Sequence, residues 1–251
     1  MMKQVLSLIP ARYGSKRFAG KPLALILGKS LIRRTYESAF GAASQTFVVT
    51  DDAAIQNHVL SFGGNVLMSP DTCATGTERI AWALKQPGSP SGEIVVNVQG
   101  DEPLVTHEAI RKVVEALVCT PGASISTAVT EVPASEAASA HIVKCVRDKS
   151  GKALYFSRAP IPHGGIMNYK HLGLYAFRRE FLLNLASLEK TPLQEAEDLE
   201  QLGWLERGFS IQTCVVKSYG PAVDTPQDIQ TVENYLCQKN LSLSQAESVP
   251  H

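Results

Sequence analysis

The chain has 251 residues, of which 44% are hydrophobic and 19% are charged, enough for the core of one large α/β domain and too apolar for disorder. Its 24 basic and 24 acidic residues cancel, which argues against non-specific nucleic-acid binding. Five cysteines without a Cys-x-x-Cys pair, and no run of membrane-spanning length, favour a reduced cytoplasmic protein.

Short apolar runs alternate with helical patterns through the first half of the chain. Strands are predicted over 5–9, ending at Pro10, and over 47–50, 66–68 and 94–98. Helices are expected over 31–43 after an N-cap at Ser30, over 53–62, over 78–85, and after an N-cap at Thr106. This βαβ order predicts a parallel sheet with helices on both faces.

From about residue 125 the pattern changes. Strands over 125–132, 143–147, 153–157 and 172–177, with a turn at 148–151, predict a smaller antiparallel lobe over about 125–177. Helices over 181–186, 193–206 and 226–237 and a strand over 211–216 follow. We expect one domain over 1–240 and a frayed tail, rich in Ser and Gln, over 241–251.

The loop after the first strand is strongly cationic. It carries Arg12, Lys16, Arg17 and Lys21, and no acid precedes Glu37. A loop at the carboxyl end of a parallel strand can surround a polyanion with guanidinium, ammonium and backbone N–H groups. A solvated basic turn is the alternative. The crowding of the cations at a strand-to-helix junction favours a small anionic ligand.

Asp101 follows the predicted central strand in the run QGDEP. Ligands of open parallel sheets bind beyond the carboxyl ends of the strands, and Gly100 lets the backbone approach such a ligand closely. An acid beside a cationic phosphate loop suits Mg²⁺, which takes one or two carboxylates and leaves other positions to phosphate and water. We therefore assign Asp101 to a metal and Glu102 to the start of the next helix.

A second metal carboxylate is predicted ahead of the last helix. Thr225 as N-cap, Pro226 at the first helical position and Asp228 three residues after the cap together form a helix start. This accounts for Asp228 and leaves Asp224 without a local role. Asp224 is therefore our choice of partner for Asp101 on Mg²⁺.

The segment 75–79, TGTER, has two interpretations. It is either an ordinary capped helix start or a segment that holds a base or a ribose through its backbone and Arg79. Gly28-Lys29-Ser30 lacks the first glycine of a P-loop, and no G-x-G-x-x-G follows the first strand. These absences exclude a P-loop NTPase and argue against a dinucleotide oxidoreductase.

Polar residues in the second half of the chain are also open to two interpretations. His171 and Tyr175 are an even number of residues apart, so they share one face of a predicted strand. With Arg158 nearby, this face suits an acidic sugar, but a solvent-facing strand explains it as well. Glu200 and Gln201 fall in the middle of a predicted helix, where charged residues are usually exposed.

These residues together make the chain resemble the 3-deoxy-manno-octulosonate (Kdo) cytidylyltransferase family, or CMP-Kdo synthetases. The resemblance covers Ile9 to about Glu233 in eight ordered stretches: IPARYGSKRFAGKPL, VVTDD, GTER, VVNVQGDEP, VKCV with ALYFSRAPIP, HLGLYAFR, DLEQL and VDTPQD. It implies a nucleotide-diphospho-sugar transferase fold, with a Rossmann-like sheet and a dimerising lobe. It also implies a Mg²⁺-dependent homodimer that transfers CMP from CTP to Kdo for lipopolysaccharide biosynthesis and releases pyrophosphate.

The resemblance implies roles for individual residues. The loop that holds the triphosphate is matched by Arg12, Arg17 and Lys21. The nucleotide-binding segments are matched by Gly76, Arg79, Gln99 and Gly100. The Mg²⁺ carboxylates are matched by Asp101 and Asp224. The acidic-sugar pocket is matched by Arg158, His171, Tyr175, Glu200 and Gln201.

The chain departs from the family pattern in three places. The segment 163–170 is shorter than in many members, Gly203 replaces a usual arginine, and Gln194 stands where Glu is frequent. Two rival functions follow from the same residues. One is a nucleotidyltransferase for sialic acid or one that uses UTP. The other is a catalytically idle regulator that binds nucleotides.

Overall fold

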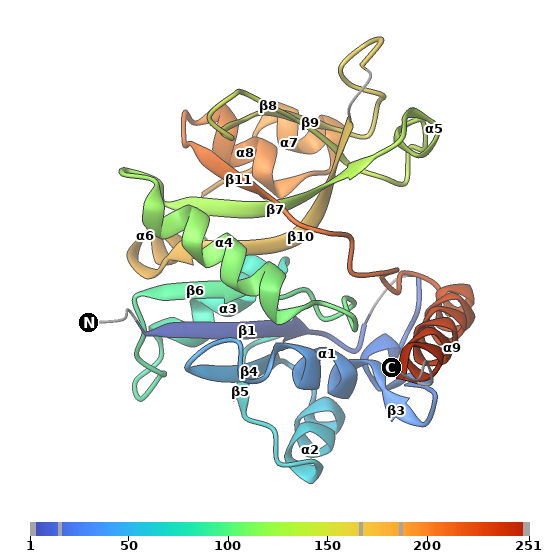
Figure 1. Ribbon diagram of the computed structural model, residues 1–251. Helices are drawn as coiled ribbons and strands as arrows, with labels where there is room; N and C mark the ends of the chain where they lie inside the picture. Colours follow the sequence, from blue (N-terminus) through green and yellow to red (C-terminus); the bar gives the residue numbers. More distant parts are fainter. Residues whose placement is uncertain (1–3, 15–16, 166–167, 186–187, 248–251) are drawn as a thin grey trace.

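A mixed sheet forms the centre of the molecule (Figure 1). The computed structural model describes residues 4–247, except 15–16, 166–167 and 186–187. In this part of the chain, nine strands form one sheet in the order β11–β7–β10–β6–β1–β4–β5, with β8 beside β10 and β9 beside β8. Their bounds are β1 (Val5–Ala11), β4 (Gln45–Thr50), β5 (Val66–Met68), β6 (Ile94–Asn97), β7 (Ile125–Val132), β8 (Lys144–Arg147), β9 (Ala153–Ser157), β10 (Asn168–Arg178) and β11 (Ile211–Val215).

The first half of the sheet is parallel, as predicted. β1 pairs in parallel with β4 and β6, and β4 pairs in parallel with β5. The prediction that β1 ends at Pro10 was wrong, because the strand continues to Ala11. Its pairing with β6 stops at Leu8, so Pro10, which has no N–H to donate, is paired with β4 alone.

The strands after residue 125 extend this sheet instead of forming a separate one. β10 pairs antiparallel with β6 and with β7, and β11 pairs in parallel with β7. The hairpin of β8 and β9 continues the antiparallel part beyond β10. The lobe expected over 125–177 is thus continuous with the parallel strands, because β10, buried from Leu174 to Phe177, is an interior strand.

Helices cover both faces of the sheet, which confirms that prediction. One core cluster holds apolar residues of α1 (Leu31–Ala39), α2 (Ala53–Ser61) and α4 (His107–Cys119). The cluster on the other face holds residues of α3 (Gly76–Lys85), α6 (Arg179–Leu185) and α8 (Glu200–Glu206). The remaining elements are the short helix η1 (Lys21–Leu23), β2 (Leu25–Ile26), β3 (Lys29–Ser30), α5 (Ala134–Ala137), α7 (Pro192–Glu197) and α9 (Pro226–Glu247).

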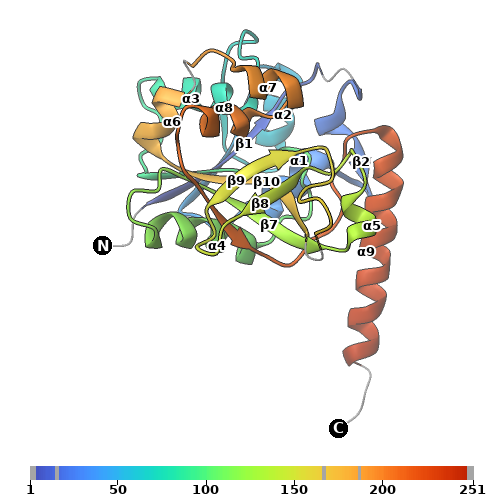
Figure 2. The ribbon, with the colours of Figure 1, turned by 90° about the horizontal axis from the view of Figure 1, so that it is seen from above.

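Three predicted helices differ clearly from the observed ones, the first being α1, which ends at Ala39 and not at 43. The helix expected over 193–206 is divided into α7 and α8, because Asp198 adopts a left-handed conformation with φ 53° and ends α7. The last helix does not end at 237 but continues as α9 to Glu247, since no glycine or proline interrupts it. Figure 2 shows the end of α9 extending beyond the rest of the molecule. Among the described residues, no helix has the length and hydropathy needed to cross a bilayer.

Candidate active site

A cleft of about 340 Å³ opens at the carboxyl ends of β1 and β6. Ligands of open α/β sheets bind at this edge. The predicted site residues that line the cleft are Arg12, Arg17, Lys21, Gly76, Arg79, Gln99, Gly100, Asp101, Glu200 and Asp224. Lys16, the fourth cation of the predicted loop, lies outside the described residues. The cleft therefore brings the cationic loop, both chosen aspartates and the segment 75–79 together.

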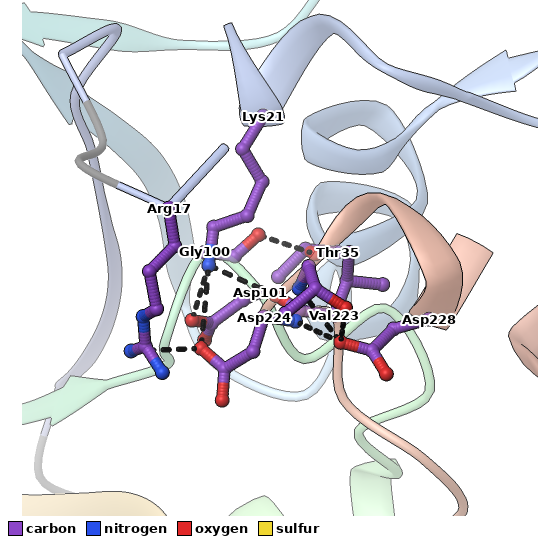
Figure 3. Close-up of polar contacts among 9 residues, drawn as sticks. Arg17, Lys21, Thr35, Gly100, Asp101, Val223, Asp224 and Asp228 are labelled. Atoms are coloured by element: carbon purple, nitrogen blue, oxygen red, sulfur yellow. Dashed lines mark hydrogen bonds and ion pairs between the residues drawn. The ribbon is translucent and has the colours of Figure 1, made fainter. Parts of the chain in front are cut away.

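Asp101 and Asp224, far apart in the sequence, both lie within reach of the Lys21 ammonium (Figure 3). The Lys21 Nζ is 2.8 Å from Asp101 Oδ2 and 3.9 Å from Asp224 Oδ1. A backbone hydrogen bond of 3.0 Å from Val223 N to Asp101 O ties the two segments together. The Arg17 guanidinium adds a contact of 3.3 Å to Asp224 Oδ1. The structure thus juxtaposes the two carboxylates, and their binding of Mg²⁺ stays a prediction.

The start of α9 leaves Asp224 available, as the sequence predicted. Asp228 Oδ2 accepts hydrogen bonds from Asp224 N, Thr225 N and Thr225 Oγ1, at 2.9, 2.7 and 2.9 Å. Burial opposes ionisation of Asp228, but these backbone hydrogen bonds outweigh it and lower its pKa. Asp228 therefore has a structural role at the helix start, and the Asp224 carboxylate faces the cleft cations.

The donor set at this position fits Mg²⁺. Both candidate ligands offer hard carboxylate oxygens, and their side chains are 31% and 54% exposed, for Asp101 and Asp224 respectively. Within the described residues, no cluster of three or more His, Cys, Asp or Glu side chains could hold a metal ion. Two carboxylates without a third protein ligand match the preference of Mg²⁺ for sites that phosphate and water complete.

Glycines hold the backbone close together at the end of β6. A Cβ on Gly100 would lie 2.7 Å from the Pro10 carbonyl oxygen, a contact that backbone atoms cannot relieve easily. A Cβ on Gly76 would lie 3.0 Å from Pro10 Cγ, and one on Gly173 would lie 3.1 Å from Gln99 Cγ. Gly76 therefore leaves room for the Pro10 ring and Gly173 for the Gln99 side chain, and Gly100 allows the Asp101 loop to pack against β1.

We expect Gly100→Ala to lower the free energy of unfolding by about 1–3 kcal/mol, because the added methyl group overpacks a contact between two backbone segments. Chemical denaturation measures this loss. Gly14→Ala is the matched control from the same cleft region, since no atom lies within 4 Å of its added Cβ and its φ is not positive. Equal free energies of unfolding for the two variants would show that the loop around Gly100 moves to accommodate the methyl group without a loss of stability.

The prediction for Glu102 was wrong. Glu102 lies in a turn, and α4 begins at His107 after an N-cap at Thr106, whose hydroxyl oxygen accepts from Ala109 N at 3.2 Å. Burial, with a further contribution from Asp101, raises the pKa of Glu102 to about 8. The apolar run Leu104-Val105 was the signal for this buried turn, since Val105 belongs to the core.

Arg79 is held by protein groups. Its guanidinium is 2.8 Å from Asp51 Oδ2 and also donates to Ser69 Oγ and the Pro70 carbonyl. Its side chain is 3% exposed. The predicted cap Thr75 accepts from Glu78 N at 3.1 Å. The segment is therefore a capped helix start that also lines the cleft, and its binding of a base or a ribose stays a prediction.

Of the five residues matched to the acidic-sugar pocket, only Glu200 lines the cleft in the described part of the chain. It accepts a hydrogen bond of 2.8 Å from Thr77 Oγ1, and burial raises its pKa. It is the first residue of α8 and not a mid-helix residue, while Gln201 is buried beside it. Arg158 is bound to Glu197 through its backbone N and its Nε.

His171 and Tyr175 contact each other inside the molecule, with ring centroids 5.2 Å apart. A register shift between Leu172 and Tyr175 interrupts the simple alternation, and Gly173 was its sequence signal. Tyr175 is buried in the core, so a solvent-facing strand does not describe this segment. Whether these residues and Arg158 bind a sugar stays a prediction.

The surroundings of His171 favour its neutral form. The single hydroxyl hydrogen of Thr127 is donated to the Leu174 carbonyl at 2.9 Å, so Thr127 Oγ1 accepts from His171 Nε2, also at 2.9 Å. Burial lowers the pKa of His171 to about 3. The stabilising effect of this neutral ring is complete above the unfolded pKa of about 6.5 and is lost as pH falls toward 3.

We expect the His171 ring to account for about 1–2 kcal/mol of the stability lost between pH 7 and pH 5, because below pH 6.5 the unfolded chain binds a proton that the folded chain excludes. Urea unfolding of the wild type and His171→Asn at both pH values measures it. The variant should lose less stability than the wild type over this interval. Parallel losses would contradict a buried neutral histidine.

Comparison with known proteins settles the family. The family model described as cytidylyltransferase matches residues 6–212. The chain belongs to the cytidylyltransferase family. This cytidylyltransferase is 47% identical over 254 residues to the 3-deoxy-manno-octulosonate cytidylyltransferase of Protochlamydia amoebophila, covering 97% of this chain and 98% of that protein. It is 49% identical over 256 residues to the protein of the same name from Chlamydia caviae, covering 96% and 100%.

Solved structures confirm the predicted fold class. CMP:2-keto-3-deoxy-manno-octonic acid synthetase complexed with CTP matches this cytidylyltransferase with a TM-score of 0.88 and 35% identity, over 94% of this chain and 99% of that one. The 4-diphosphocytidyl-2C-methyl-D-erythritol synthase from Anaerococcus prevotii matches with a TM-score of 0.62 over 93% and 98% of the two chains. At 15% identity, this second match shows the fold alone.

Two departures from the family pattern lie in contact with each other. A Cβ on Gly203 would overlap the side-chain oxygen Oε1 of Gln194, which packs from α7 against α8. The space that a larger residue at 203 would need is therefore taken up by Gln194. A larger residue at 203 would therefore require the Gln194 side chain to move.

Proposed function

We propose that this cytidylyltransferase transfers CMP from CTP to Kdo, giving CMP-Kdo and pyrophosphate, and so activates Kdo for lipopolysaccharide biosynthesis. The observation that carries the proposal is the near-complete match to relatives named 3-deoxy-manno-octulosonate cytidylyltransferase, at 47% and 49% identity. The cleft supports it independently, because it combines three cations with a pair of carboxylates.

In the proposed mechanism, the anomeric hydroxyl of Kdo attacks the α-phosphorus of CTP in line with the departing pyrophosphate. Arg12, Arg17 and Lys21 line the cleft and would hold the phosphates, and Arg17 and Lys21 would offset the charge on the leaving group. Asp101 and Asp224 would hold Mg²⁺. When bound, Mg²⁺ would offset phosphate charge and make the attacking hydroxyl more acidic.

The remaining assignments are part of the same proposal. Gln99 and Gly76 lie next to each other in the cleft, where they would contact the nucleoside, and Glu200 would mark the side from which the sugar approaches. Arg158, His171, Tyr175 and Gln201 complete the proposed sugar pocket. Mg²⁺ dependence, a homodimer and a cytoplasmic location are proposed from the resemblance.

A pyrophosphate-release assay tests the proposal. The enzyme is given CTP, UTP, ATP or GTP with Kdo or sialic acid, each with Mg²⁺ or with EDTA. Release with CTP, Kdo and Mg²⁺ alone is the expected result. Release with sialic acid or UTP would favour a different nucleotidyltransferase. Nucleotide binding without release under every condition would favour a regulator.

A further inference from the structure

The Lys21 ammonium contacts both carboxylates at the position where a bound cation would be expected (Figure 3). Its Nζ donates to Asp101 Oδ2 at 2.8 Å and to the Val223 carbonyl at 2.9 Å, and lies 3.9 Å from Asp224 Oδ1. The Lys21 side chain is only 15% exposed, less than either aspartate. The protein thus supplies its own cation at this position.

A divalent cation at these carboxylates would compete with the Lys21 ammonium, which contacts one oxygen of each. Mg²⁺ binds carboxylate oxygens at about 2.1 Å, so an ion on Asp101 Oδ2 would lie next to an ammonium hydrogen-bonded to that same oxygen. Like charges at such separations repel strongly in a partly buried site. Either Lys21 moves away, or the metal binds weakly.

Phosphate groups offer Lys21 a place to move to. Lys21 lines the cleft together with Arg12 and Arg17, so a triphosphate held by this loop would bring oxygens within its reach. A lysine has a flexible four-carbon stem and a compact charge, which lets it exchange one anionic partner for another. The nucleotide would remove the competing cation from the carboxylates as it binds.

We propose that Lys21 couples nucleotide binding to metal binding: it holds the metal position in the nucleotide-free enzyme and releases it when a triphosphate binds. This inference rests on the proposed function, because it takes a metal-bound nucleoside triphosphate as the ligand. Linkage makes the coupling reciprocal, so a metal on the two aspartates also favours the nucleotide. The order of events follows from charge, since a metal ion and the Lys21 ammonium repel each other when both lie at Asp101.

Mn²⁺ binding to the nucleotide-free enzyme, followed by the electron paramagnetic resonance of free Mn²⁺, tests the proposal without any turnover. The wild type should bind Mn²⁺ weakly. Lys21→Met and Lys21→Gln should bind it about tenfold more tightly, a change typical of coupled sites. Lys21→Gln keeps a donor for the Val223 carbonyl, which protects against a loss of local structure. In the Lys21→Gln background, Asp101→Asn should abolish the gain.

Arg17→Gln is the matched control. It removes the same charge from the same loop, but Arg17 is 70% exposed and, among the described residues, pairs with Asp224 at 3.3 Å and not with Asp101. It should tighten Mn²⁺ binding much less than either Lys21 variant. A general loss of positive charge would instead give equal effects in the three variants, and that result would overturn the proposal.

The wild type supplies a measurement that needs no variant. Water-proton relaxation separates enzyme-bound Mn²⁺ from Mn²⁺ bound to free CTP, so it reports the metal affinity of the nucleotide complex. That affinity should exceed the nucleotide-free affinity by about tenfold. Equal affinities would refute the coupling. If they are equal while pyrophosphate is still released from CTP and Kdo, this inference fails and the proposed function stands.

Discussion

Asp101→Asn is expected to lower kcat for CMP transfer by about 100-fold or more, corresponding to about 2.7 kcal/mol, the scale of losing one strong electrostatic contact in a transition state. The amide preserves the shape of the side chain and one oxygen for Lys21 Nζ, so the fold should survive. The loss of activity would come from the missing negative charge on Asp101, which with Asp224 would hold Mg²⁺ in the proposed mechanism. The two carboxylates already lie close enough to contact one cation, the Lys21 ammonium.

Pyrophosphate release at saturating CTP, Kdo and Mg²⁺ measures the effect, and thermal unfolding checks the fold. Glu37→Gln is the control, because it also removes a carboxylate from ion pairs, with Lys29 and Arg33, but on the surface away from the cleft. It should keep wild-type turnover. Wild-type turnover in Asp101→Asn would remove this residue from the mechanism.

Features set by neighbouring residues could be predicted from the sequence. Ser30 and Thr106 cap α1 and α4, with side chains that accept from Arg33 N and Ala109 N. Asp228 accepts the hydrogen bonds at the start of α9 that its position three residues after Thr225 indicates. The same local reasoning assigned Asp228 to the helix start, where it accepts from Thr225, and left Asp224 for the metal.

Features set by distant segments were not predictable in this way. The apolar runs of β7 and β10 identify strands, but a pattern of period two does not say which strand will lie alongside. The position of β10 between β6 and β7 depends on pairing that only the folded sheet defines. The burial of Glu102 and the division of α7 from α8 at Asp198 likewise arise from packing and not from propensity.

The Lys21 contacts show the same limit within the site. The sequence placed Lys21 in a phosphate loop and Asp101 and Asp224 on a metal, as separate assignments. The structure joins all three, because η1 directs the Lys21 side chain toward the end of β6 and the segment before α9. A cation that is expected to bind phosphate is therefore also in contact with both carboxylates.

Arg79→Met is expected to lower the free energy of unfolding by about 3–5 kcal/mol, because it leaves the partner carboxylate of a buried ion pair without its counter-charge. The Arg79 guanidinium is 3% exposed and lies 2.8 Å from Asp51 Oδ2, whose side chain is 16% exposed. It also holds the Ser69 hydroxyl, so its removal would loosen the segment between β5 and α3. Chemical denaturation measures the loss.

Arg33→Met provides the comparison, since Arg33 pairs with Glu37 on the exposed face of α1 and should cost less than about 1 kcal/mol. The double variant Asp51→Asn/Arg79→Met should recover part of the stability, because it removes the uncompensated charge that the single variant leaves. A loss in Arg79→Met as small as that in Arg33→Met would mean that the guanidinium is not a structural anchor. It would then be free to bind the nucleotide, as the resemblance implies.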